Sequence, residues 1–128
     1  DIIEPELSYQ IVVALFEIYN TLGPGYSERY YQRALAAIFL ERKIQFKQEV
    51  LLPLIFHGVT LGRQRCDFLV DGKILIELKK GKVFSRKNVE QVFDYLRVSG
   101  LKLAILANIA PNGIIFKRIV NSDSYIRK

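Results

Sequence analysis

Residues 64–79 read QRCDFLVDGKILIELK, two stretches of alternating side chains that meet at Asp71-Gly72. Alternation with a period of two is typical of β-strands, and Asp-Gly is a frequent tight turn, so this segment predicts a β-hairpin. One face of this hairpin is expected to be apolar. The other face carries polar residues together with two leucines, and we expect any catalytic side chains on that face. The apolar face is expected to hold Cys66, Phe68, Val70, Ile74, Ile76 and Leu78.

The length of the turn determines which residues of the hairpin face each other. A two-residue loop would place Asp67 and Glu77 on opposite faces and expose half of the apolar set. A three-residue loop at 70–72, with its glycine in the left-handed conformation, pairs Leu69 with Lys73 and keeps the apolar set together. Asp67 and Glu77 then become diagonal neighbours on one face. The hydrophobic pattern therefore predicts an odd-length loop or a bulge.

Patterns on both sides of the hairpin complete an α/β (α+β) domain of order α-α-β-β-β-α-β-β, a mixed sheet flanked by helices. Gly23-Pro24-Gly25 ends the first helix, Ser27 caps the second and Gly100 ends the third. The right-handed crossover rule lays the fourth strand parallel to the third. The expected elements are helices at 6–22 and 27–42, a strand at 45–56 with Pro53 at an edge or bulge, a turn at His57-Gly58, the hairpin at 64–79, a helix at 86–99 and strands at 101–108 and 113–120.

The composition is that of one globular domain, which we expect to span residues 1–128. Half of the 128 residues are hydrophobic and a quarter are charged, and neither a repeat nor a linker divides them. The apolar runs are shorter than a membrane span, and residues 1–20 are acidic where a secretory signal would be basic. A single cysteine indicates a reducing compartment, so we expect a cytoplasmic protein without membrane contact.

The charge balance favours an anionic partner such as nucleic acid. Lysine and arginine outnumber aspartate and glutamate 19 to 13, for a net charge of +6. His57 and Cys66 are each the only residue of their type, which argues against a structural zinc site, a Cys/His nucleophile pair and a Ser/His/Asp triad. Any catalysis would therefore depend on carboxylates and lysine.

Asp67, Glu77 and Lys79 are the candidate catalytic residues on the hairpin. Two carboxylates suit Mg²⁺ or Mn²⁺, which keep several waters and bind phosphate oxygens. Lys79 points the same way as Glu77 and could orient or deprotonate a metal-bound water, or stabilise charge on a phosphate. The alternative is an exposed ion pair of Glu77 and Lys79 with Arg65, without chemical meaning.

Motifs along most of the chain resemble the PD-(D/E)XK nuclease superfamily and, within it, the small GxxExxY family. GYSERYY at residues 25–31 matches the motif that names the family. The resemblance implies a restriction-endonuclease-like core, and Cys66 departs from it by standing where the superfamily name has proline. The resemblance continues through residues 61–62, 65–68, 77–79, 91–97 and 106–108.

The resemblance also implies a role for individual residues. Asp67 and Glu77 become metal ligands for Mg²⁺ or Mn²⁺, and Lys79 becomes the catalytic lysine. Glu28 becomes an acidic helix residue that faces the same site and helps to hold the metal, as does a backbone carbonyl near Leu78.

A further element of the resemblance concerns the third expected helix. Gln91 and Tyr95 resemble the Q-x-x-x-Y element of exonuclease-like members, whose glutamine approaches the lysine and the substrate. We therefore assign Gln91 to catalysis and Tyr95 to nucleic-acid binding, although their i, i+4 spacing would equally suit a local hydrogen bond or a half-buried ring. The basic stretch that follows Lys79 is expected to meet a phosphate backbone, through Lys80, Lys82, Arg86 and Lys87.

These expectations lead to a metal-dependent nuclease that hydrolyses phosphodiester bonds, with DNA favoured over RNA as the substrate. The competing hypothesis is a basic nucleic-acid or protein binding module that keeps a nuclease-like fold but does not cut. A homodimer, or a partner subunit of a defence or repair system, is compatible with either hypothesis.

Overall fold

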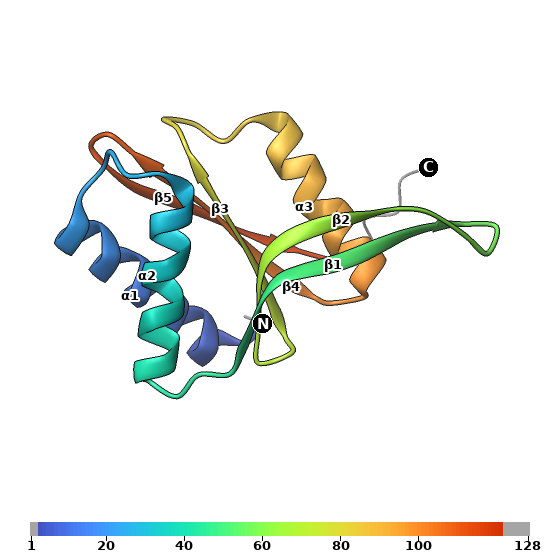
Figure 1. The fold of residues 1–128 in the computed structure, drawn as a ribbon, viewed down its shortest axis with the longest axis horizontal. Coiled ribbons are helices and arrows are strands. Elements are labelled where there is room, and N and C mark those ends of the chain that lie inside the picture. The colour runs from blue at the N-terminus through green and yellow to red at the C-terminus, as the bar shows by residue number, and fades with distance from the viewer. Residues whose placement is uncertain (1–2, 122–128) are drawn as a thin grey trace.

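The computed structural model describes residues 3–121 and shows a five-stranded sheet with helices on both faces (Figure 1). The predicted fold class and the predicted order of elements are confirmed. Within the described residues, no helix combines the length and the hydropathy needed to cross a bilayer. The elements are α1 (Pro5–Leu22), α2 (Glu28–Glu41), β1 (Phe46–Phe56), β2 (Val59–Val70), β3 (Ile74–Lys80), α3 (Arg86–Ser99), β4 (Leu103–Ala110) and β5 (Gly113–Val120).

The strands follow the sheet in the order β1-β2-β3-β4-β5. Only β3 and β4 are parallel, joined by α3, as the crossover rule predicts. The largest differences from the predicted strand boundaries are that β2 begins at Val59, five residues before the predicted hairpin, and that β4 begins and ends two residues later than predicted, at Leu103–Ala110. β1 is an edge strand, which is where a strand can accommodate Pro53 without losing a ladder hydrogen bond.

The turn between β2 and β3 has the predicted odd length but a different register. Val70 pairs with Ile74, so the three-residue loop is 71–73 and the predicted pairing of Leu69 with Lys73 is wrong. The cause is the turn itself, because the Lys73 N–H donates to the Val70 carbonyl at 2.9 Å while Gly72 is left-handed. Continuing this register brings Asp67 directly opposite Glu77 rather than diagonal to it.

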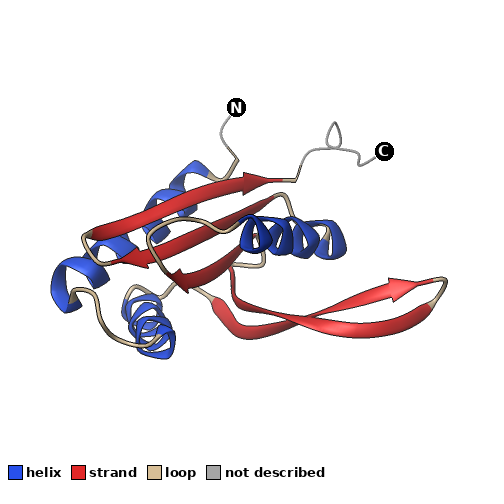
Figure 2. Cartoon of the chain, turned by 90° about the horizontal axis from the view of Figure 1, so that it is seen from above, coloured by secondary structure: helices blue, strands red, loops and turns tan. Residues whose placement is uncertain are grey.

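The sheet separates two apolar layers, with α1 and α2 on one face and α3 on the other (Figures 1 and 2). Most of the predicted apolar face packs under α1 and α2, but Cys66 belongs to the layer under α3. The face of β2 and β3 that was expected to be polar is largely covered, because Leu69 and Leu75 also pack in the layer under α3. Since β3 is a central strand covered on both faces, Glu77 is only 4% exposed.

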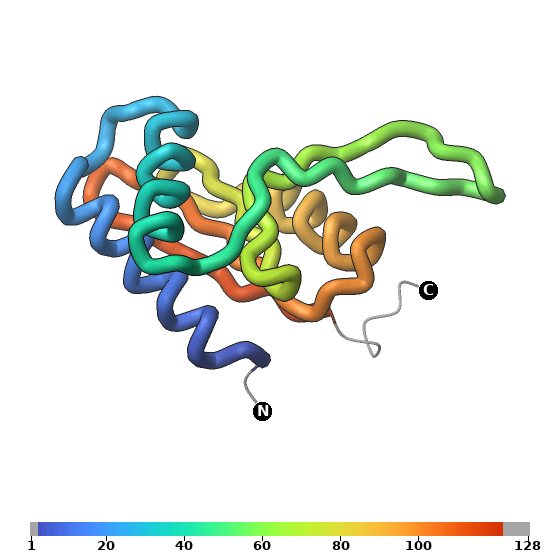
Figure 3. Tube along the Cα trace, turned by 60° about the horizontal axis from the view of Figure 1, so that its bottom comes forward, coloured from blue at the N-terminus to red at the C-terminus, as the bar shows by residue number. Residues whose placement is uncertain are grey.

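The hairpin of β1 and β2 extends well beyond the rest of the sheet (Figures 2 and 3). β3 pairs only with residues 68–70 of β2, so beyond them β2 is paired with β1 alone. We refer to residues 50–66 as the arm. The predicted turn at its tip is confirmed, with both His57 and Gly58 left-handed.

Candidate active site

The loop before α2 is held by a tyrosine and thereby sets the position of Glu28. The buried Tyr31 hydroxyl donates to the Gly23 carbonyl at 2.6 Å and accepts from the Tyr26 N–H at 3.2 Å. Glu28 lies in the first turn of α2, and its Oε2 accepts from the Lys80 N–H at 3.1 Å. The start of α2 is therefore connected to the end of β3.

Asp67 and Glu77 stand together where β2 and β3 separate. The Asp67 N–H donates to Glu77 Oε1 at 3.0 Å, and the Leu78 N–H donates to Asp67 Oδ2 at 2.8 Å. The last backbone pair between β2 and β3 is Phe68 with Ile76. Just beyond it, the backbone N–H groups of Asp67 and Leu78 donate to carboxylate oxygens instead of to backbone carbonyls. Each carboxylate is held in position by the strand that carries the other.

Two further groups contact Glu77. Lys79 Nζ lies 3.6 Å from Glu77 Oε2, and the Tyr95 hydroxyl donates to the same oxygen at 3.3 Å and to the Arg65 carbonyl at 2.7 Å. Lys79 is about a quarter exposed, so its amine is accessible from outside while its partner is buried. The alternative of a solvated surface ion pair with Arg65 is wrong, because Glu77 lies inside the protein.

Burial changes the acidity of this cluster. It raises the pKa of Glu77 to about 7, and repulsion from Asp67 adds to the effect while the Asp67 N–H and Lys79 oppose it. Burial also raises the pKa of Asp67, against the Leu78 N–H and Lys79. Desolvation and the charge of Glu77 raise the pKa of Tyr95, which therefore stays protonated. A cation beside the two carboxylates would offset the cost of ionising both of them.

The carboxylate pair fits a hard divalent cation. Among residues 3–121, no three His, Cys, Asp or Glu side chains converge closely enough to hold a metal. Mg²⁺ needs only one or two carboxylates because it retains waters and binds substrate phosphate. Glu28 is near enough for its charge to raise the pKa of Asp67, so a third carboxylate faces the pair. At Leu78 the structure shows the N–H at the site, bonded to Asp67.

A cleft of about 550 Å³ opens beside Asp67, between α2 and the strands β1 and β2. It contains three exposed arginines that the sequence reasoning did not assign to the site: Arg29, Arg33 and Arg65. Two signals point to them in retrospect. Arg29 and Arg33 are i, i+4 neighbours immediately after Glu28, and Arg65 precedes Asp67 by two residues on the same strand face. Together they place three guanidinium groups in a cleft that also holds the carboxylates of Glu28, Glu49 and Asp67.

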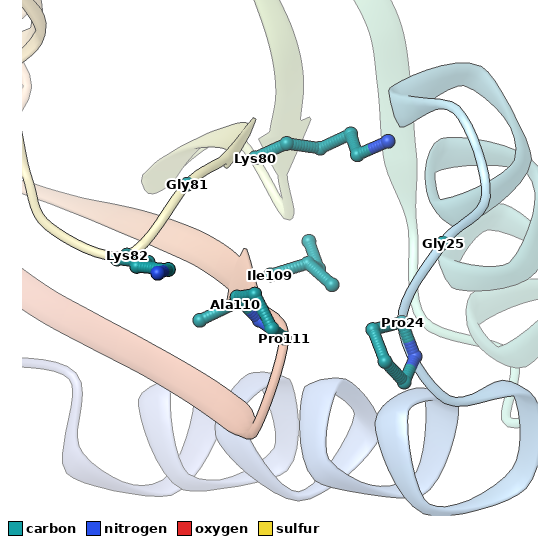
Figure 4. Close-up of a pocket in the computed structure, with 8 residues that line it drawn as sticks. All are labelled: Pro24, Gly25, Lys80, Gly81, Lys82, Ile109, Ala110 and Pro111. Atoms are coloured by element: carbon teal, nitrogen blue, oxygen red, sulfur yellow. The ribbon is translucent and has the colours of Figure 1, made fainter.

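The predicted basic stretch lies on the other side of the cluster. Lys80 and Lys82 line a pocket of about 550 Å³ (Figure 4). Pro24 and Gly25 stand across from them, and the end of β4 lies between. The last two members of the stretch are at the start of α3, where Arg86 is 3.1 Å from Glu90 and Lys87 is exposed.

Of the two residues assigned on α3, Tyr95 is placed differently from the expectation. Tyr95 is 1% exposed within the layer under α3, so its ring packs in the core rather than lying on the nucleic-acid surface. Its hydroxyl positions Glu77 instead. Gln91 is half-buried one turn earlier, and among the described residues its side chain forms no hydrogen bond.

A buried asparagine holds the segment that follows Lys79. Asn108 pairs with Lys79 in the β3–β4 ladder, and its Nδ2 donates to the Val83 carbonyl at 2.9 Å. The Gly81 N–H donates to the Ile109 carbonyl at 3.2 Å, which fixes the same segment. A polar residue inside an otherwise apolar strand was the available signal for this role.

Comparisons with known proteins identify a family and a shared fold. A family model described as the PD-(D/E)XK nuclease superfamily matches residues 5–119. The crystal structure of SSO0001 has a TM-score of 0.57 and 20% identity over 91% of this chain and 57% of that chain. An alkaline exonuclease from Laribacter hongkongensis, LHK-Exo, has a TM-score of 0.54 and 14% identity over 96% of this chain and 74% of that one.

The same exonuclease in complex with dAMP gives a TM-score of 0.52 and 16% identity, over 94% of this chain and 73% of that chain. At these identities the likeness is one of fold. The chain spans little more than half of the length of SSO0001. No curated protein matches the sequence significantly.

Proposed function

Because the chain belongs to the PD-(D/E)XK nuclease superfamily, we propose that it is a metal-dependent nuclease that hydrolyses phosphodiester bonds in DNA. The observation that carries this proposal is the pairing of Asp67 and Glu77, each of which accepts a backbone N–H from the other's strand. Such a constrained pair, partly buried beside an accessible lysine, costs stability and is typical of a catalytic centre.

Asp67 and Glu77 would hold Mg²⁺ or Mn²⁺, while Glu28 adds a third negative charge near Asp67 on the cleft side. Such an ion lowers the pKa of a bound water and polarises a phosphate. Tyr95 keeps Glu77 oriented toward Asp67, and Lys79 places a positive charge at the open side of the pair. That amine would neutralise charge that develops on the phosphate during hydrolysis.

The substrate would pass between two groups of cationic side chains on either side of Asp67 and Glu77. Arg29, Arg33 and Arg65 line the cleft along α2, and Lys80 and Lys82 line the pocket across from it. The preference for DNA is supported by the complex of a structurally similar exonuclease with dAMP, a deoxynucleotide.

We further propose that the chain is a GxxExxY-type member and that residues 1–128 form one nuclease domain. The support for the first is physical: Tyr31 fastens the loop at Gly23, and α2 begins where Glu28 can bond to Lys80. The second rests on the continuous sheet and its two apolar layers, which run through the described residues. Residues 1–2 and 122–128 lie outside these.

The test is a cleavage assay on linear, circular, single-stranded and branched DNA and on RNA, with Mg²⁺, Mn²⁺ or a chelator. We expect DNA to be cut only with the metal, and Glu77→Gln to lower the rate at least about a hundredfold, as loss of a metal ligand does. Glu41→Gln, on the exposed end of α2, is the matched control and should cut like the wild type.

Metal binding should be followed in the same samples by calorimetry. Binding of Mg²⁺ or Mn²⁺ that is lost in Glu77→Gln, without cutting of any substrate, would indicate a site that requires a partner subunit. If neither binding nor cutting is observed, the nuclease proposal fails and a non-cutting nucleic-acid or protein binding module replaces it.

A further inference from the structure

The arm is a two-stranded ribbon without a neighbour in the sheet. Only β1 pairs with β2 over residues 59–66, because β3 reaches no farther than Phe68. The base of the ribbon packs against α3, and its tip extends beyond the helices in Figures 2 and 3. An isolated ribbon is at best marginally stable in water, so one that protrudes from a domain suggests a ligand for it.

The chemistry of the arm is polarised along its length. Residues 50–66 contain no aspartate or glutamate, and their only permanent charges are Arg63 and Arg65. Both arginines are exposed, and among the described residues neither forms an ion pair. The tip is apolar, with side chains that are about three-fifths exposed: Ile55, Phe56, Val59 and Leu61.

The charged part of the arm is continuous with the candidate active site. Asp67, Arg65 and Arg63 alternate along β2, so their side chains leave the same face of the strand. Arg65 and Asp67 line one cleft together. The even-numbered residues Leu52 and Cys66 point to the other face of the arm, where they pack into the apolar layer under α3. A row of cationic side chains therefore runs from the carboxylates toward the tip.

We propose that the arm binds duplex nucleic acid next to the cleavage position, an inference that rests on the proposed nuclease function and extends it to a double-stranded substrate. A two-stranded ribbon has the width that a groove of a duplex admits. Arg63 and Arg65 bind phosphates as the backbone leaves the cleft. The apolar tip enters the groove, where side chains such as isoleucine and phenylalanine act as wedges against base steps.

The length of the arm predicts where this contact lies. Val59 and Asp67 are eight positions apart on one strand. At about 3.3 Å per residue this separation is about 26 Å. A duplex rises about 3.4 Å per base pair, so the tip contacts the duplex about eight base pairs from the cleaved phosphate, on one side only.

Nucleic acid fits the arm better than a second copy of the chain does. A two-fold interface would place identical cationic ribbons against each other with no acidic residue from either arm to compensate. A phosphate backbone supplies the missing negative charge, and it is already the ligand expected in the adjoining cleft. Charge complementarity and continuity with the cleft therefore select the duplex.

The first test measures binding in a chelator, so that no substrate is cut, to a labelled 20-base-pair duplex by fluorescence anisotropy. The double variant Ile55→Ser/Phe56→Ser should raise Kd about tenfold, since burial of one large apolar side chain has about that effect. Leu40→Ser, an equally exposed leucine on α2, is the matched control and should leave Kd unchanged.

The salt dependence of Kd tests the arginines separately from the tip. Arg63→Ala should reduce the slope of log Kd against log salt by about 0.9, the value for one phosphate contact. Lys102→Ala, an exposed cation at the opposite end of α3 from Arg86, should leave the slope as in the wild type.

The position of the tip can be read from a photo-crosslink. In Val59→Cys a thiol-reactive crosslinker will modify residue 59, because the natural Cys66 is fully buried and burial raises the pKa of its thiol. We expect crosslinks to the duplex, and none from Leu40→Cys. With a substrate cut at a known position, crosslinks should fall about eight base pairs from it.

The outcomes separate this inference from the nuclease proposal. Crosslinks from Val59→Cys and weaker duplex binding by the arm variants, with neither metal binding nor cutting by the wild type, would support the arm and overturn the proposed function. Cutting with unchanged binding in every arm variant would overturn the arm alone. It would also be overturned if Ile55→Ser/Phe56→Ser converted a dimer to a monomer, measured by light scattering, without changing Kd, because the arm would then be a protein interface.

Discussion

The two halves of β2 break opposite rules of protein folding. Residues 66–70 lie between two helical layers, and 68–70 pair with strands on both sides, yet this half includes Asp67, whose partner Glu77 is buried. Residues 59–65 pair on one side only, yet Val59 and Leu61 are exposed to water. Burying a carboxylate and exposing a cluster of apolar side chains both cost free energy. A single strand thus carries two features that stability alone does not explain.

The comparison shows how a small domain can separate catalysis from binding. The inner half of β2 receives its rigidity from neighbouring strands, which a catalytic pair requires because its geometry must be maintained. The outer half pairs with β1 alone and extends beyond the rest of the sheet, where it can contact a ligand at a distance from the carboxylates. Four predictions test this division, from the largest expected effect to the smallest.

Two phenylalanines, Phe68 in the inner half of β2 and Phe56 at the tip of the arm, should contribute very differently to the free energy of unfolding. Phe68→Ala should reduce the free energy of unfolding by about 3–5 kcal/mol, because Phe68 is fully buried and contacts the rings of Phe39 and Phe46. Phe56→Ala should change it by less than about 0.5 kcal/mol. Urea unfolding followed by circular dichroism measures both. Comparable losses would mean that the arm is part of the core in solution.

The pH dependence of stability should originate in the inner half. A carboxyl whose pKa is about 7 when folded and about 4.5 when unfolded binds its proton more tightly in the folded chain. Its contribution to stability should therefore be complete below about pH 4.5 and should be lost as the pH rises through 7, by on the order of 2–3 kcal/mol. The measurement is urea unfolding in a chelator from pH 4 to 8.

Glu77→Gln provides the control for this titration. Its amide oxygen can still accept the Asp67 N–H, but it carries no titrating proton, so most of the fall should disappear and the variant should exceed the wild type in stability at pH 8. Mg²⁺ should restore the wild type at pH 8 and have little effect at pH 5. A wild-type chain whose stability rises between pH 5 and 7 would contradict the assignment.

Tyr95 connects α3 to Arg65 of β2 and to Glu77 of β3, and its hydroxyl should contribute a smaller amount to stability. Tyr95→Phe leaves the Arg65 carbonyl and Glu77 Oε2 without this donor, so we expect a loss of about 1–2 kcal/mol. Cleavage should also decrease, because Glu77 loses a positioning contact. Its pH profile should move to higher pH, since the Tyr95 hydroxyl lowers the pKa of Glu77. A purely structural role would leave the profile unmoved.

The elements around the inner half of β2 could be predicted from the sequence, because local and periodic patterns determine them. Alternation around Asp71-Gly72 predicted the hairpin and the odd loop, and the helix at 86–99 predicted the parallel strand after it. The register was missed because it depends on one turn hydrogen bond, from Lys73 to Val70, which no hydrophobic pattern reveals.

The outer half and the walls of the cleft could not be predicted in this way. The reach of the arm depends on where β3 stops pairing, which is a tertiary property. The same holds for Arg29 and Arg33, which reach the cleft only because α2 packs beside β1 and β2. Tyr95 was assigned to nucleic-acid binding from the resemblance to a Q-x-x-x-Y element, and the sequence does not reveal that its ring packs in the layer under α3.

Tyr31 offers the smallest and most discriminating test, because it is buried at the start of α2 and yet acts through one polar atom. Tyr31→Phe keeps the ring in the core and removes the hydrogen bond to Gly23, at a cost of about 1 kcal/mol. If that bond positions Glu28, metal-dependent cleavage should decrease beyond what this loss of stability explains. Tyr30→Phe alters an exposed neighbour in the same motif and should change neither quantity. Equal activity in both variants would show that Tyr31 only fills space, and the connection from this loop to the end of β3 would then have to depend on Glu28 and Lys80 alone.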